Sequence, residues 1–303
     1  MGTVKAMIRS LRLRTLPLSL SGVCLGLLLA AADYRISLTT ALLTMLTTIF
    51  LQILSNLSNE LGDVLSGTDG ARREGPSYGL NSGELGIGTM KMMIAVTAAA
   101  CIISGLLMLR SSFGTLFCMD SICLMLLGGA AIMAAMKYTL GRNPYGYRGL
   151  GDASVFLFFG IVAVLGSYFV ATHTIGSWFL LLPAAAIGCF SVGVLNVNNI
   201  RDMKSDAATR STVAIRLGEK GARIYQTVLI ALGWILMTLY CVFRFQDPWH
   251  YLYFLSAPLF ILHIKGIWSR EGRALDPMLP LLVTGTFCFA LLAGTGFVIF
   301  LIR

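Results

Sequence analysis

Apolar residues in this sequence gather in blocks of about twenty, the length of helix that spans a hydrocarbon core of about 30 Å. Hydrophobic residues make up 56% of the 303 residues and charged residues only 12%, more apolar side chain than a soluble core needs. Backbone groups cannot stay unpaired in lipid, so each block is predicted to be an α-helix. The nine predicted spans are 15–32, 38–57, 90–109, 115–136, 153–171, 177–198, 222–243, 249–267 and 278–301.

Lys and Arg are unevenly divided between the two sides of this predicted membrane protein. The N-terminus and the segments after the second, fourth, sixth and eighth spans hold 19 of the 23. Because basic loops stay in the cytoplasm, the N-terminus is predicted to be cytoplasmic and the C-terminus to lie outside. This sidedness accounts for the net charge of +9 without any nucleic-acid partner.

The whole chain, 1–303, is predicted to form one all-α transmembrane domain built from two similar halves. Asp-rich segments at 55–86 and 196–223, predicted as loops, follow the second and sixth spans. The basic start of the chain has an alternative interpretation, a cleaved leader. Cleavage of the first span would leave eight spans and place the new N-terminus outside. That orientation would oppose the distribution of Lys and Arg in the remaining loops, so the chain is expected to keep its first span.

Both Asp-rich segments begin with the same element, Asn-x3-Asp, and continue to a further Asp. The first cluster is Asn59, Asp63 and Asp69, and the second cluster is Asn198, Asp202 and Asp206. If the helix continues past residue 198, the second cluster shares one face, because residues four apart stack. Solvated loops are the ordinary alternative, but the repeated element at matching positions favours a shared role.

Like charges in such a row repel unless a cation joins them, and Mg²⁺ suits because it takes oxygen ligands and substrate phosphates. Two facing clusters could hold a diphosphate through Mg²⁺. Its remaining oxygens could be clamped by cations of the two segments: Arg72, Arg73, Arg201, Lys204 and Arg210. The Gly- and Tyr-rich segment 137–152 is either a turn-rich connector or a cap over this site. As a cap, its Tyr rings would stack on an aromatic substrate.

The stretches "NELGDVLSGTD" (59–69) and "NNIRDMKSD" (198–206) resemble the two Asp-rich motifs of the UbiA-type intramembrane prenyltransferases. The stretch "KYTLGRNPYGYRGLGDASVFLFFG" (137–160) is similar to the branch that prenylates 1,4-dihydroxy-2-naphthoate in menaquinone biosynthesis. The resemblance covers the chain from the first predicted span to the seventh.

The resemblance implies nine helices around a central cavity open to the membrane, with Mg²⁺ and the diphosphate at its cytoplasmic mouth. It implies transfer of a polyprenyl group from polyprenyl diphosphate to 1,4-dihydroxy-2-naphthoate with loss of CO₂, giving demethylmenaquinone, in the cytoplasmic membrane of a bacterium. The implied metal ligands are Asn59, Asp63, Asp69, Asn198, Asp202 and Asp206, and the four Asp residues are also implied to be catalytic. Lys137, Tyr138 and Arg148 are expected to contact the aromatic acid, and Arg14 a phosphate or carboxylate.

Two departures from the family pattern are visible. Glu60 stands where the family commonly has Asp, and Arg210 stands near a usual Gly-Lys pair. Within the family the acceptor could also be 4-hydroxybenzoate, haem or a chlorophyll precursor. Residues 69–72, Asp-Gly-Ala-Arg, are similar to part of the Asp-rich motif of CDP-alcohol phosphotransferases. That function is disfavoured, because the further Asp residues that the motif needs are absent downstream. A transporter is disfavoured because the carboxylates gather at one membrane face rather than at the midplane.

Overall fold

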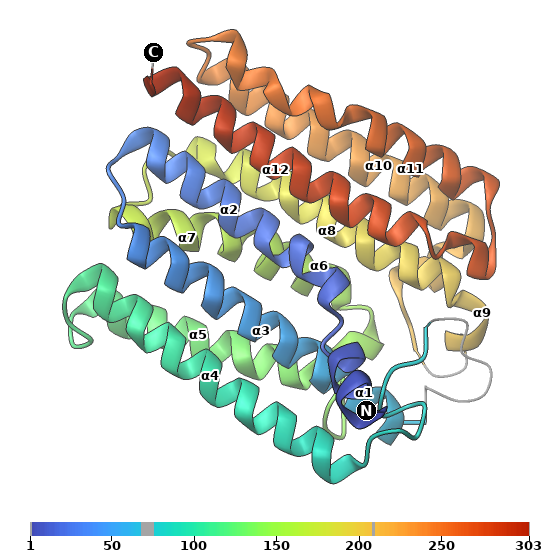
Figure 1. The fold of residues 1–303 in the computed structure, drawn as a ribbon. Helices are drawn as coiled ribbons and strands as arrows, with labels where there is room; N and C mark the ends of the chain where they lie inside the picture. Colours follow the sequence, from blue (N-terminus) through green and yellow to red (C-terminus); the bar gives the residue numbers. More distant parts are fainter. Residues whose placement is uncertain (1, 68–75, 208–209, 303) are drawn as a thin grey trace.

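Long helices lie side by side through the molecule, with α1 and α9 at one end and the C-terminus at the other (Figure 1). The computed structural model describes residues 2–67, 76–207 and 210–302, and these are helical apart from short connections. The helices are α1 (Gly2–Ser10), η1 (Leu13–Thr15), α2 (Leu16–Asp33), α3 (Leu38–Leu65), α4 (Ile87–Phe113), α5 (Met119–Lys137), η2 (Tyr145–Arg148), α6 (Gly151–Val155), η3 (Phe156–Val162), α7 (Ala163–Thr172), η4 (Trp178–Leu180), α8 (Leu181–Arg201), α9 (Met203–Asp206), α10 (Val213–Phe243), η5 (Pro248–Ser256), α11 (Ala257–Ser269), η6 (Gly272–Leu275) and α12 (Met278–Ile302).

In the described part of the chain, nine helical stretches are long and apolar enough to cross a membrane. Each coincides with one of the nine predicted spans, so the predicted all-α polytopic fold is confirmed. Many of their side chains face outward rather than into the bundle, as expected where lipid replaces water as the solvent.

Both Asp-rich segments are more helical than predicted. Helix α3 continues beyond residue 57 to Leu65, so Asn59 and Asp63 belong to the helix. Helix α10 begins at Val213, where the Thr212 side chain accepts a hydrogen bond from the Ile215 N–H and caps it, but its backbone is kinked at Gly218, so a short helical turn precedes the long helix predicted from 222. Hydropathy ends a span at the first polar turn, whereas hydrogen bonding and capping carry the helix further.

The main buried core joins α2, α7, α8, α10, α11 and α12. At its centre, the Phe190 ring lies 4.7 Å from that of Phe260, and Trp234 lies 5.2 Å from Phe289. These pairs are tilted or edge-to-face, the arrangements that aromatic quadrupoles favour. A smaller core joins α1, α3, α4 and the segment around Leu80 and Leu85. The two cores leave space between α3 and α8, where the Asp-rich elements end.

The fifth span is irregular, since α6 passes through η3, a π-helix, before α7. A π-helix is rare and often accompanies a functional site. Gly160 in η3 packs against α8, where a Cβ would lie 2.6 Å from the Ala184 carbonyl oxygen. This close contact fixes η3 beside α8. The π-helix was not predicted from the sequence, because its apolar pattern resembles that of an α-helix.

Candidate active site

The last turns of α3 carry Asn59 and Asp63, which lie one above the other on one helix face. The Asp63 carboxylate oxygen Oδ1 accepts hydrogen bonds from Tyr147 Oη and Arg210 Nη2, each at 2.7 Å. The Asn59 side-chain oxygen accepts from Thr139 Oγ1 at 3.2 Å. Each partner comes from a distant part of the chain, so this half of the site forms only when the chain has closed around it.

The end of α8 carries Asn198, and the chain then bends at Asp202, where ψ is 6°. The bend keeps the helical hydrogen bonds, since the Asp202 N–H donates to the Asn198 carbonyl and the Asp206 N–H to the Asp202 carbonyl, both at 2.9 Å. The three residues therefore keep the stacked spacing expected of a continuing helix. Arg201 binds Asp202 through two hydrogen bonds of 2.8 and 2.6 Å, and also donates to Asp276 at 2.8 Å.

Segment 138–152 is fixed against α3 at a close backbone contact. A Cβ on Gly62 would lie 2.5 Å from the Thr139 hydroxyl oxygen, so only glycine allows this approach. Thr139 in turn donates to the Ser58 carbonyl at 3.0 Å. Burial raises the pKa of Tyr138 above its usual value, so its hydroxyl keeps its proton at neutral pH.

The described residues of both clusters line one cavity of about 170 Å³, the polar cavity. Its lining includes Asn59, Asp63, Asn198, Asp202, Asp206, Arg14, Tyr138, Arg201 and Arg210. The structure thus brings residues of α3, α8 and α9 together with Arg14 of η1, Tyr138 after α5 and Arg210 between α9 and α10. Asp69 and Arg72 lie outside the described residues. Lys137 and Arg148 are exposed and are not among the residues that line the cavity.

The oxygen donors of the polar cavity are chemically suited to Mg²⁺. Carboxylate and amide oxygens are the hard ligands it takes, with substrate phosphates and water completing the set. Among the residues described, no three of His, Cys, Asp and Glu lie close enough to enclose an ion by themselves. Amide oxygens, water or the oxygens of a bound phosphate could complete the ligands of an ion held here.

Arg210 lies between the two clusters, with its guanidinium 2.7 Å from Asp63 and 3.8 Å from Asp206. Its guanidinium carbon lies 4.6 Å from the centre of the Tyr147 ring. Burial acts to lower the pKa of Arg210, but the carboxylates of Asp63 and then Asp206 outweigh it, so its pKa is raised. Arg210 is therefore a permanent cation that joins the two halves of the site.

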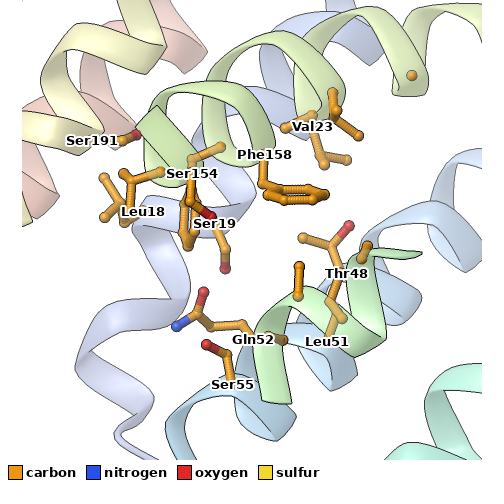
Figure 2. A pocket seen from close by; sticks show the side chains of 18 of the residues that line it. Leu18, Ser19, Val23, Thr48, Leu51, Gln52, Ser55, Ser154, Phe158 and Ser191 are labelled. Atoms are coloured by element: carbon orange, nitrogen blue, oxygen red, sulfur yellow. The ribbon is translucent and has the colours of Figure 1, made fainter. Parts of the chain in front are cut away.

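A second, larger cavity of about 390 Å³ adjoins the first and is mostly apolar; we call it the apolar cavity. Figure 2 shows Thr48, Leu51 and Gln52 of α3 opposite Phe158, with Leu18 of α2 on the side of Ser19 and Ser154. Residues common to both linings are Arg12, Thr15, Asn59, Tyr138, Val194, Leu195 and Asn198. A molecule with an anionic head and an apolar tail could therefore occupy both cavities at once.

Comparison with known proteins identifies the family of this chain. The model of the UbiA prenyltransferase family matches residues 19–279. This chain belongs to the UbiA prenyltransferase family. It is 37% identical to the 1,4-dihydroxy-2-naphthoate octaprenyltransferase of Escherichia coli, over 96% of this chain and 94% of that protein. It is 34% identical to the protein of the same name from Mycobacterium tuberculosis, over 88% of each chain.

Solved structures of the UbiA family share the fold. An apo UbiA homolog from Aeropyrum pernix aligns with a TM-score of 0.68 and 15% identity, covering 97% of this chain and 98% of that one. A UbiA homolog from Archaeoglobus fulgidus, bound to GPP and Mg²⁺, aligns with a TM-score of 0.60 and 15% identity, over 95% and 99% of the two chains. These likenesses confirm the UbiA fold for this chain.

Three residues at this UbiA-type site were not among the predicted site residues. Tyr147 binds Asp63, and Asp152 lines the polar cavity while accepting a hydrogen bond from Tyr225 at 3.0 Å. Arg12 lines both cavities, and two of its nitrogens, Nε and Nη2, are buried with no hydrogen-bond partner among the described residues. In sequence alone, a polar residue at the edge of a span looks like an ordinary interfacial residue, so no local signal identifies these three.

Arg12 also has an unusual backbone conformation, with φ of 51° in the left-handed region. A non-glycine residue there is uncommon and costs about 1–3 kcal/mol, a strain that gathers at functional sites. Its guanidinium carbon lies 4.0 Å from the centre of the Tyr78 ring. The strained backbone and the stacked ring hold this cation at the junction of the two cavities.

Proposed function

We propose that this protein transfers a polyprenyl group from polyprenyl diphosphate to 1,4-dihydroxy-2-naphthoate, releasing diphosphate and CO₂. The observation that carries the proposal is the shared wall between a charged cavity and an apolar one, which fits a diphosphate joined to an isoprenoid tail. The names of relatives at 34–37% identity support the naphthoate as acceptor.

The polar cavity is the place for the diphosphate. Asn59, Asp63, Asn198, Asp202 and Asp206 would hold Mg²⁺, with Asp69 retained from the sequence pattern as a further ligand. Bound there, Mg²⁺ would neutralise charge on the departing diphosphate. Arg210, and Arg12 at the junction, would donate hydrogen bonds to the remaining phosphate oxygens.

The reaction needs a carbon–oxygen bond to break so that the diphosphate leaves with the bonding electrons and an allylic cation remains. The apolar walls exclude water from this cation, which water would otherwise capture. The electron-rich naphthoate ring attacks it and forms the new carbon–carbon bond. Loss of the carboxylate as CO₂ returns its bonding electrons to the ring and restores aromaticity. The immediate product is then the hydroquinone form of demethylmenaquinone.

The acceptor is expected to lie against the shared wall, where Tyr138 supplies an aromatic face and a neutral hydroxyl. Arg14 lines the polar cavity and donates to Tyr78 at 2.9 Å, so it remains a candidate for the acceptor carboxylate. Lys137 and Arg148 stay predictions, and both side chains are exposed outside the lining of the polar cavity. We place the site on the cytoplasmic side of a bacterial membrane, a proposal that the distribution of Lys and Arg supports.

Product formation by the purified protein in detergent tests this proposal. The assay supplies octaprenyl diphosphate and Mg²⁺ with either 1,4-dihydroxy-2-naphthoate or 4-hydroxybenzoate. Prenylated naphthoate with CO₂ release, abolished by EDTA and restored by added Mg²⁺, is the expected result. Reaction with 4-hydroxybenzoate alone would overturn the acceptor while keeping the chemistry. No diphosphate release from folded protein would overturn the enzyme.

A further inference from the structure

The lining of the apolar cavity is most exposed on α5, which places an opening of the cavity there. Of the described residues that line this cavity, Leu127 and Gly128 are the exposed ones, and Leu127 is 38% exposed. The others are buried or half-buried. Because α5 is an apolar spanning helix, this opening faces lipid rather than water.

The opening lies near the middle of the membrane. Gly128 is nine residues from both ends of α5, Met119 and Lys137. At about 1.5 Å per residue, this places it about 14 Å from either end of the helix. Helix α5 is also the most exposed of the nine candidate spans in the described part of the chain.

One face of α5 connects this opening to the polar cavity. Its cavity-lining residues are Leu124, Leu127, Gly128, Ala131, Ala134 and Ala135. They recur at the spacing of a single helical face, and the face ends one turn before Tyr138, which lines both cavities. The glycine and alanines between Leu127 and Tyr138 on this face leave room for an apolar path from the shared wall to the lipid.

A long polyprenyl chain needs such an exit. A cavity of about 390 Å³ lies near the lower end of the range, about 300–1,000 Å³, that encloses drug-sized ligands. A chain of eight isoprene units with its diphosphate held in the polar cavity must therefore continue outside. Outside the cavity, lipid and the apolar face of α5 would cover the tail. The apolar surface of the tail would then stay away from water.

We propose that the polyprenyl tail leaves the apolar cavity over Gly128, so that this glycine admits long donors. The proposal rests on the proposed function and adds to it the residue that determines which chain lengths are accepted. A Cβ at Gly128 would meet no atom within 4 Å, so a larger side chain there would fill the opening without disturbing the packing.

The neighbouring glycine offers a matched control. Gly129 also has no atom within 4 Å of a built Cβ, lies on the same exposed helix, and does not line the cavity. Gly128→Leu and Gly129→Leu therefore add the same group to the same helix, one in the path and one beside it. Neither residue has positive φ, so the backbone accepts both substitutions.

The experiment measures kcat/KM with octaprenyl diphosphate and with geranyl diphosphate, a short donor, for the wild type and both variants. Gly128→Leu is expected to lower kcat/KM for octaprenyl diphosphate about tenfold or more, a discrimination that a misfitting apolar group can cause. It should leave geranyl diphosphate unaffected, and Gly129→Leu should change neither donor.

Each other outcome has a definite meaning. Equal losses for both donors in Gly128→Leu, or no loss for octaprenyl diphosphate, would overturn the exit over Gly128 while leaving the proposed function in place. A loss for octaprenyl diphosphate in Gly129→Leu of the same size would also overturn it. A wild type that prenylates no aromatic acceptor with either donor would overturn the proposed function, and the exit with it.

Discussion

The ends of α3 and α8 carry the same Asn-x3-Asp element, but the structure supports the two carboxylates differently. Asp63 at the end of α3 is held by Tyr147 and Arg210, which lie 84 and 147 residues away in the chain. Asp202 at the end of α8 is held by its neighbour Arg201, which also binds Asp276. The same spacing thus places equivalent carboxylates in one cavity. Contacts distant in sequence hold the first, and a neighbouring residue holds the second.

This difference shows which part of the site depends on the completed fold. The α8 end is a local unit, because adjacent residues form its two charge-assisted hydrogen bonds. The α3 end needs segment 138–152 and Arg210 to arrive from elsewhere. Arg210 contacts carboxylates from both ends, so closing the first half of the site also joins it to the second.

The largest expected effect tests whether the two ends are equivalent in the reaction. Asp63→Asn and Asp202→Asn each remove one carboxylate while keeping the size of the side chain. Both are expected to lower kcat/KM by about 10²–10³-fold, the loss typical when one group that stabilises transition-state charge is removed. The measurement is prenylated naphthoate formed at saturating Mg²⁺.

Asp276→Asn is the matched control for the second half. It breaks the other contact of Arg201, but Asp276 does not line the polar cavity. It should therefore keep most of the activity. If Asp63→Asn or Asp202→Asn alone retained near-normal turnover, the two ends would not be equivalent and the paired metal site would be wrong.

The next effect compares Arg201 with Arg210, which both line the polar cavity. Arg201 is 6% exposed and bound by two carboxylates, so Arg201→Ala leaves Asp202 without its partner and should destabilise the protein by about 3 kcal/mol. Arg210→Ala should lower kcat/KM more than Arg201→Ala does, and should lower the unfolding temperature less, because Arg210 lies in the cavity between the two clusters. Thermal unfolding in detergent, measured beside turnover, distinguishes them; a reversed order would contradict this division.

The sequence predicted the parts of this molecule that depend on local pattern. Apolar blocks of about twenty residues located all nine spans, because lipid imposes length and helical hydrogen bonding on each. The spacing of four placed Asn198, Asp202 and Asp206 on one face. The pairing of the two clusters in one cavity was predicted because the same element recurs after matching helices.

The rest depends on contacts that no local pattern records. Arg201 lines the polar cavity, and its predicted role as a diphosphate clamp stays a prediction, but its ion pairs with Asp202 and Asp276 are visible only in the structure. Arg12 was passed over, since its burial at the junction of the cavities is visible only in three dimensions. The extension of α3 to Leu65 was also missed, because hydropathy falls before the helix ends.

A smaller effect is expected at Arg12, the cation of the shared wall that lacks a carboxylate partner among the described residues. Arg12→Ala should lower kcat/KM about tenfold, the loss of roughly one hydrogen bond to a charged group. Arg12→Lys should restore part of it. Arg9→Ala is the control, because Arg9 is half-buried, pairs with Glu84 and lines neither cavity. Equal effects of Arg9→Ala and Arg12→Ala would show that only surface charge matters.

The smallest effect sharpens the contrast between the two ends. Tyr147→Phe removes the hydroxyl that donates to Asp63 at 2.7 Å, while the ring beneath Arg210 remains. Losing one such hydrogen bond, worth about 0.5–1.5 kcal/mol, should lower kcat/KM about two- to tenfold. Because Tyr147 supports only the α3 end, combining Tyr147→Phe with Asp63→Asn should add little, whereas combining it with Asp202→Asn should multiply the two losses. Multiplied losses in both double variants would mean that Tyr147 acts independently of Asp63, and that the α3 carboxylate does not need its distant partner.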